Sequence, residues 1–249
     1  MKIFLVLFSV IVVAAVVAVA AVAVTKRHGA GEVQHETRSV SGFSRIEVSG
    51  LAEITLRQGR TEAVSVEAPA ETLPRIRTEV RNRTLIVNST EQRRWWDWFG
   101  ARGAGRTPRI VIDLINLEQV ESAGAIKLGA DTLRAESLRI DSSGASSIKI
   151  ADLQAKSLRI EGSGAIKAQL AGKVGTQVVD ISGAGSYQAA GLVSDKADVR
   201  VSGAGKAAVN ASTSLKVDIS GAGIVEYEGD PKIEQTISGV GKVRRRDRD

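Results

Sequence analysis

The chain has 249 residues, of which 43% are hydrophobic, and a net charge of +6, which is enough apolar material for a sizeable folded domain. It contains no cysteine, so disulfides, thiolate metal sites and a lipid-modified N-terminal cysteine are excluded. Most of the excess positive charge falls in residues 91–106 and 244–249, and the rest of the chain lacks the basic face expected of a nucleic-acid-binding protein.

The first predicted element is a hydrophobic helix over residues 1–24. Its apolar run is broken only by Ser9 and is long enough to cross a bilayer, which takes about 20 residues. Ala-Val-Ala also occurs twice near its end, as suits signal-peptidase cleavage. A cleaved signal peptide and a retained transmembrane anchor both remain open. Either one delivers the chain across a membrane, and residues 25–35 are then a linker.

Short strands are predicted next. Residues 43–56 form two strands that meet at Gly50, and further strands are expected at residues 64–67, 76–80, 84–87 and 110–114. A hairpin turn is predicted at residues 81–83. We expect this portion to begin or cap the stack that follows, because an open end would leave strand edges unpaired.

An insertion at residues 91–107 holds all three tryptophans of the chain in a polar, glycine-rich setting. Its aromatic and basic residues are the candidate interaction surface, namely Trp95, Trp96, Trp98, Phe99, Arg93 and Arg94. Two interpretations remain open. The rings cap the stack, or they form an exposed tip that contacts a protein partner, a glycan or a membrane surface.

The rest of the chain repeats a short glycine-centred phrase every 18 to 20 residues. The aligned glycines are Gly124, Gly144, Gly164, Gly183, Gly203, Gly221 and Gly239. Apolar and charged residues alternate before each glycine, which is typical of a strand with one buried face. The fold predicted for residues 36–243 is an all-β parallel β-solenoid (β-helix) with 18–20-residue coils, followed by a basic tail at 244–249. A leucine-rich repeat is the alternative, but its asparagine is missing.

A column of carboxylates lies three residues before the glycines, and a column of lysines three residues after them. The carboxylates are Glu121, Asp141, Glu161, Asp180 and Asp218. A catalytic or metal-binding groove and a solvated charged face both fit this column. We favour the solvated face, in which the lysines offset the repulsion between stacked carboxylates. The sequence therefore predicts no catalytic residue, no metal site and no cofactor.

The order of these segments resembles a known family. Residues 40–50, 78–80 and 84–87, followed by the Ser-Gly-Ala-Gly repeats, are similar to the family called putative auto-transporter adhesin, head GIN domain. The resemblance covers about residues 36–243, and the insertion at 91–107 departs from it. It implies a β-helical fold and export to the bacterial envelope, either the periplasm or the cell surface.

The function expected from these features is that of a non-enzymatic envelope module, structural or adhesin-like. Two alternatives remain open: a glycan-binding or glycan-processing β-helix, and a membrane-anchored accessory protein. The expected partners are a cell-surface glycan, an envelope protein or a membrane surface, and not nucleic acid.

Overall fold

The structure is a computed structural model that describes residues 32–89 and 107–246. Over these ranges the chain is almost entirely β-structure, and the one helical element is a single 3-10 turn, η1 (Leu73–Arg75). The all-β prediction is therefore confirmed. The hydrophobic helix predicted for residues 1–24 and the insertion predicted at 91–107 fall outside the described residues, except for Thr107.

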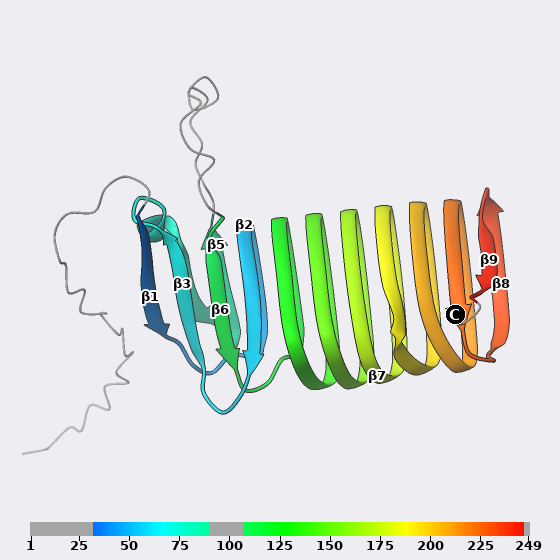
Figure 1. Ribbon diagram of the computed structural model, residues 1–249, viewed down its shortest axis with the longest axis horizontal. Helices are drawn as coiled ribbons and strands as arrows, with labels where there is room; N and C mark the ends of the chain where they lie inside the picture. The colour runs from blue at the N-terminus through cyan, green and yellow to red at the C-terminus, as the bar shows by residue number, and fades with distance from the viewer. Residues whose placement is uncertain (1–31, 90–106, 247–249) are drawn as a thin grey trace, which may run out of the picture.

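Nine strands make up one sheet (Figure 1). The first six are β1 (Val33–Ser39), β2 (Arg45–Gln58), β3 (Ala63–Pro69), β4 (Arg77–Arg81), β5 (Thr84–Ser89) and β6 (Arg109–Leu114). The last three are β7 (Gln119–Glu228), β8 (Lys232–Gly239) and β9 (Lys242–Arg245). The four short strands predicted before the repeats correspond to β3, β4, β5 and β6.

The prediction of a parallel β-solenoid is wrong, because the sheet is mixed and curls into a half-barrel. β2 pairs in parallel with β5, β6 and β7, whereas β1–β3, β3–β6 and β4–β5 are antiparallel pairs. The physical reason lies in the connections. One of them is the hairpin turn predicted at residues 81–83, which is confirmed: Asn82 and Arg83, both with positive φ, join β4 to β5, and strands joined so tightly can only pair antiparallel.

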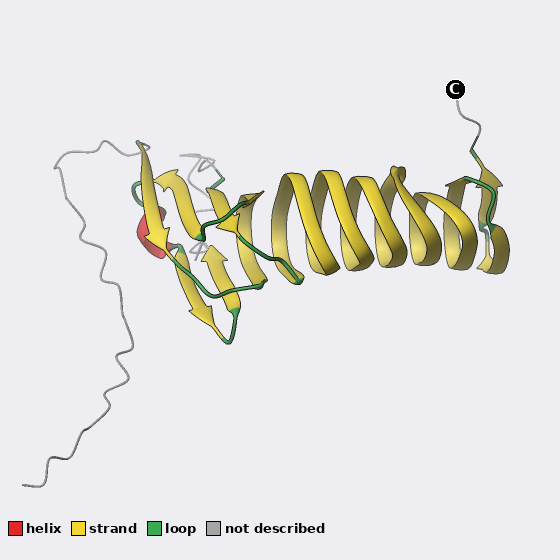
Figure 2. Cartoon of the chain, turned by 90° about the horizontal axis from the view of Figure 1, so that it is seen from below, coloured by secondary structure: helices red, strands yellow, loops and turns green. Residues whose placement is uncertain are grey.

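β7 is a single strand of 110 residues that winds along the molecule (Figures 1 and 2). Each repeat of β7 is called a rung below. β2 pairs with the first rung in the register that sets Gly50 opposite Gly124, so residues 43–56 do form the first member of the repeat, as predicted. β7 runs without interruption through the six aligned glycines from Gly124 to Gly221, so the predicted break into two strands is not observed there. It is observed at Gly239, where β8 ends before β9 begins at Lys242.

The core lies inside the curled sheet. Residues at alternate positions of each rung are buried, as at Ile140, Ile160, Val179 and Val199, each at most 1% exposed. Burying one such side chain contributes roughly 1.5–3 kcal/mol relative to leaving it in water. The period-two pattern of the sequence therefore sets which side of β7 faces inward.

The described residues contain no helix that is long and apolar enough to cross a membrane. The prediction of a transmembrane anchor concerned residues 1–24 alone, which are not among them. The transmembrane anchor therefore stays a prediction.

Candidate functional site

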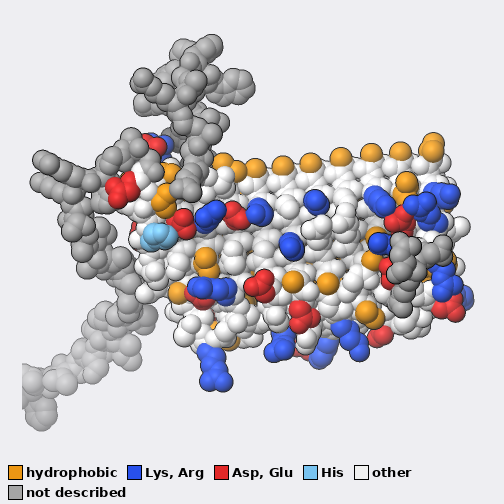
Figure 3. Space-filling view, in the orientation of Figure 1, with side chains coloured by type: hydrophobic (Ala, Val, Ile, Leu, Met, Phe, Trp, Pro, Cys, Tyr) orange, Lys and Arg blue, Asp and Glu red, His pale blue; other side chains and the backbone are white. Residues whose placement is uncertain are grey.

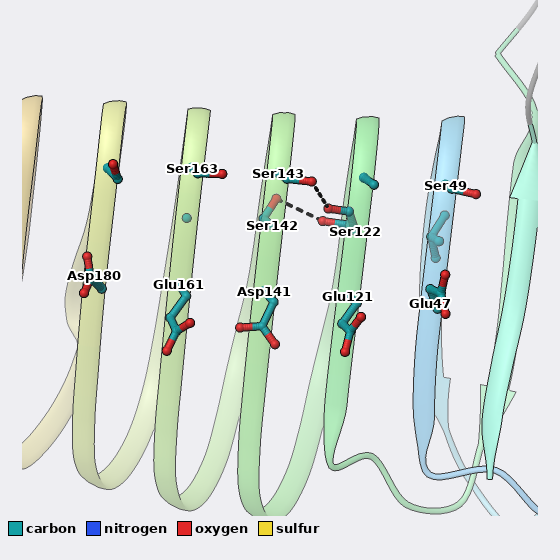
Figure 4. Close-up of a pocket in the computed structure, with 14 residues that line it drawn as sticks. Glu47, Ser49, Glu121, Ser122, Asp141, Ser142, Ser143, Glu161, Ser163 and Asp180 are labelled. Atoms are coloured by element: carbon teal, nitrogen blue, oxygen red, sulfur yellow. Dashed lines mark hydrogen bonds between the residues drawn. The ribbon is translucent and has the colours of Figure 1, made fainter. Parts of the chain in front are cut away.

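A shallow groove runs across the rungs on one flank of the molecule, beside the line of aligned glycines (Figure 4). It has a volume of about 400 Å³ and is called the acidic groove below. One carboxylate per rung lines it: Glu47, Glu121, Asp141, Glu161 and Asp180. The groove thus spans β2 and the first four rungs of β7.

Strand geometry explains why these carboxylates line up. Each lies three residues before its glycine, and the parallel register stacks equivalent positions of neighbouring rungs. Glu47, for example, is the direct partner of Glu121. Four of the five carboxylates that the sequence placed in a column, all except Asp218, therefore line the groove, and Glu47 extends the row by one rung.

Side chains two positions earlier on the same strand bind several carboxylates of this row. The Gln119 side-chain amide donates to Glu121 at 2.8 Å and to Asp141 at 2.9 Å. Arg139 then bridges Asp141 and Glu161, at 2.8 Å to each. The hydrogen bond to Asp141 is the main cause that raises the pKa of the Arg139 guanidinium. Each bridge joins two rungs and orients the carboxylates.

The lysine column does not balance the acidic groove, contrary to the prediction. Lys127 forms an ion pair with Glu53 at 2.6 Å, and the Lys127 hydrogen bond lowers the pKa of that carboxyl. Lys206 is paired with Glu226 at 3.1 Å. Because each rung turns at its glycine, residues after the glycine lie on the other flank and find acidic partners there.

Serines form the other half of the groove lining. Ser49, Ser122, Ser142, Ser143, Ser163 and Ser182 all contribute to it. The hydroxyls of Ser122 and Ser142 hydrogen-bond each other at 2.9 Å, and the Ser143 hydroxyl donates weakly to the Ser122 carbonyl at 3.4 Å (Figure 4). Ser143 and Ser163 are exposed, so their hydroxyls are accessible from solvent.

A ridge of small residues borders the groove. It consists of the aligned glycines and the residues immediately before and after them, most of which are exposed. Figure 3 shows a regularly spaced row of small hydrophobic side chains along this edge. Beyond the ridge lies a second, wider hollow of about 750 Å³, lined by alanines and by Lys127 and Lys167. The ridge thus separates the acidic groove from a hollow in which lysine and acidic side chains are paired, as Lys127 is with Glu53.

The predicted interaction surface is not among the residues that the structure describes. Arg93, Arg94, Trp95, Trp96, Trp98 and Phe99 all lie between Ser89 and Thr107, the nearest described residues. They stay a prediction.

Sequence reasoning missed the serines and the bridging residues of the groove. The bridges had a visible signal: Gln119, Arg139 and Arg159 each precede a carboxylate by two positions, so both side chains share one face of the strand. The serines had none, because serine before a glycine is common in turns that bind nothing.

The groove can act chemically as a hydrogen-bonding surface. Carboxylates accept hydrogen bonds, serine hydroxyls both donate and accept, and the row presents both kinds of group at successive rungs. Within residues 32–89 and 107–246 no three histidine or acidic side chains are grouped so that they could hold a metal ion. The arrangement suits a polar ligand that extends along the rungs.

One family model matches most of the chain. The family described as putative auto-transporter adhesin, head GIN domain, matches residues 42–231. No curated protein matches the chain significantly.

Three solved structures share the fold. A putative adhesin from Bacteroides fragilis is 21% identical with a TM-score of 0.77, and the match covers 86% of this chain and 97% of that one. A putative adhesin from Parabacteroides distasonis is 22% identical with a TM-score of 0.65, over 86% and 97%. A putative lipid binding protein from the same species is 19% identical with a TM-score of 0.64, over 87% and 98%. At such low identity these likenesses establish the fold alone.

Proposed function

Because the chain belongs to the family of putative auto-transporter adhesins with a head GIN domain, we propose that it is a non-enzymatic, adhesin-like binding module. Its ligand is a hydroxyl-rich polymer, a neutral or amino-sugar polysaccharide, that lies along the acidic groove. Its place is the bacterial envelope or the extracellular space, in keeping with the family name.

The periodicity of the groove is the observation that carries this proposal. Carboxylate and serine oxygens recur at successive rungs, and neighbouring rungs of a sheet are about 4.8 Å apart. A polymer of like units can repeat the same hydrogen bonds from rung to rung. Many weak, linked contacts then add up to a useful affinity without a deep pocket.

Charge decides which polymers fit. Carboxylates line the groove from Glu47 to Asp180, whereas the balancing Arg139 and Arg159 are not part of its lining. A polysaccharide that carries carboxylates or sulfates would meet like charge. Neutral sugars would accept and donate hydrogen bonds, and protonated amino sugars would add attraction.

The same repetition argues for binding rather than catalysis. A glycosidase needs two carboxyl groups in unequal environments, one kept protonated as the acid and one ionised. Asp141 and Glu161 instead occupy equivalent positions of neighbouring rungs, and Arg139 donates to both. This shared donor does not distinguish an acid from a base.

The test measures binding of the full-length protein to three soluble polymers: a neutral glucan, a deacetylated amino-sugar oligomer and a polyuronic acid. We expect binding to the first two and none to the third. Replacing Glu121→Gln and Glu161→Gln together should weaken amino-sugar binding at least about tenfold, because two charge-assisted contacts are lost. Ser143→Ala should weaken binding of both polymers.

The matched control is Lys167→Gln, an exposed side chain on the far side of the ridge, which should leave both affinities unchanged. Circular dichroism would check that all variants fold. The proposal fails if no polymer binds, or if Lys167→Gln weakens binding as much as the groove variants do.

A further inference from the structure

The two ends of the sheet differ in how far their apolar side chains are buried. At the end that holds β1 and β4, the apolar side chains of Phe43, Leu73 and Ile76 are buried. At the other end, β8 and β9 pair only with β7 (Figure 1). One long edge of β8 therefore has no strand beside it in the part of the chain that the structure describes.

The apolar side chains of β8 are exposed because no further described strand packs against them. Ile233 pairs in register with Leu215, and Ile237 with Ile219. Leu215 and Ile219 are 1% and 0% exposed, whereas Ile233 and Ile237 are 38% and 39% exposed. Positions that are buried in the preceding rung are thus partly exposed to solvent in the last one. An unpaired strand edge with exposed apolar residues is a site for adding another strand.

We propose that this edge pairs with the same edge of a second copy of the chain. The two β8 strands run antiparallel about a twofold axis at Gln235, which continues the sheet from one copy into the other. In this register Ile233 of each copy lies opposite Ile237 of the other, and Gln235 lies opposite Gln235. In this register odd-numbered residues of one copy lie opposite odd-numbered residues of the other, which keeps the inward side chains of both copies on one face of the sheet.

The charges of β8 suit this self-pairing. Lys232 comes opposite Ser238 of the second copy, and Glu234 comes opposite Thr236, so no like charges face each other. The arginines of β9 and the arginine after it are already paired within their own copy: Arg244 with Glu226, Arg245 with Asp230 at 3.7 Å, and Arg246 with Glu228 at 3.8 Å.

A second copy supplies a strand of matching length and pattern. The eight residues of β8 span roughly 27 Å, and the same eight residues of the second copy span the same length with the same alternation of side chains.

A cysteine at the twofold axis tests this pairing, since the chain has no other cysteine. In full-length Gln235→Cys the two sulfur-bearing residues would be opposite each other, with Cα atoms about 4.5–5.5 Å apart, within disulfide range. Mild oxidation with copper phenanthroline should convert most of the protein to a covalent dimer on a non-reducing gel. Adding Ile233→Lys and Ile237→Lys should abolish that dimer.

The matched control is Ser238→Cys on the same exposed strand. Its counterpart in the second copy would lie six residues along, roughly 20 Å away, so no dimer is expected. The proposal is overturned if Gln235→Cys gives no dimer, if both cysteines cross-link equally, or if the product contains a different protein. Wild-type sedimentation should show a dimer that dissociates on dilution, and a monomer at all concentrations would also overturn it.

Discussion

A β-carbon on Gly183 would lie 2.7 Å from the carbonyl oxygen of Gly164 on the preceding rung. Gly183 also has φ of +114°, a backbone conformation that other residues adopt only with strain. Both facts require glycine at this position. Close backbone stacking at the ridge is therefore what the glycine of the repeat provides.

Gly183→Ala should destabilise the protein by about 1–3 kcal/mol, the range for a strained backbone position. Urea unfolding followed by circular dichroism measures this. The control is Gly129→Ala, since Gly129 has no positive φ and its nearest neighbour would be 3.9 Å away. If both variants unfold at the same urea concentration, the ridge glycine is not a structural requirement.

A buried polar network stabilises the middle rungs. The Tyr187 hydroxyl donates to Gln177 at 2.9 Å, and the Gln177 amide donates to Ser194 at 2.8 Å. All three residues are at most 1% exposed. Tyr187→Phe would leave a buried oxygen of Gln177 without its donor, at a cost of about 1–3 kcal/mol. Thermal unfolding measures the loss, and a melting temperature equal to that of the wild type would contradict it.

Burial also raises the pKa of the Tyr187 phenol above its ordinary value. The folded state holds the neutral phenol, while the unfolded chain loses the proton near pH 10. Stability from this group is therefore complete below about pH 10 and decreases as pH rises beyond it. Unfolding free energies between pH 8 and 11.5 should decline more steeply for the wild type than for Tyr187→Phe. Parallel curves would show that Tyr187 does not cause the decline.

The sequence allowed much of this arrangement to be predicted, but not its pairing. Period-two alternation identified the buried positions of β7, and the aligned glycines identified the ridge. The hairpin between β4 and β5 was predicted from residues 81–83 and is confirmed. The parallel solenoid was wrongly predicted because the antiparallel pairs β1–β3 and β3–β6 lie before the repeats, where no aligned glycines indicate which strands are neighbours. The groove could be predicted only in part. Its carboxylates stand out in the sequence, but Gln119 and Arg139 each bind a carboxylate of the next rung as well as one of their own rung.

Glu226 attaches β9 to the rest of the sheet. Its side chain is only 9% exposed and lies between Arg244 and Lys206. The hydrogen bond from Arg244 is the main cause that lowers the pKa of this carboxyl. Glu226→Gln should lower the free energy of unfolding by about 1–3 kcal/mol at pH 7, because Arg244 and Lys206 lose the nearly buried carboxylate that they bind. Chemical unfolding measures the difference.

The pH dependence follows from the same lowered pKa. Stability from Glu226 is present above the unfolded pKa, near 4.5, and is lost as pH falls through the lower folded value. The gap between wild type and Glu226→Gln should therefore close in acid. As a control, Glu136→Gln removes a fully exposed pair with Lys156 and should not change the melting temperature. An equal effect of the two substitutions would refute the proposed role of Glu226.

The undescribed segment 90–106 starts and ends at nearby points of the sheet. Ser89, the last residue of β5, pairs in register with Gly50, and Arg109, the first residue of β6, pairs with Glu53. Gly50 and Glu53 are three residues apart on β2, so about 10 Å separates the two attachment points. β5 and β6 together thus follow β2 as one rung would.

Replacing residues 92–106 with a short Gly-Ser linker should therefore leave the fold nearly intact, because such a linker easily spans 10 Å. We expect the melting temperature to change by only a few degrees. If the aromatic and basic residues from Arg93 to Phe99 form an interaction surface, the same replacement should abolish binding to isolated envelope material. The replacement removes all three tryptophans, so the tryptophan emission maximum is measured first on the intact protein. Strongly blue-shifted emission together with unfolding on loop replacement would mean that the rings belong to the core.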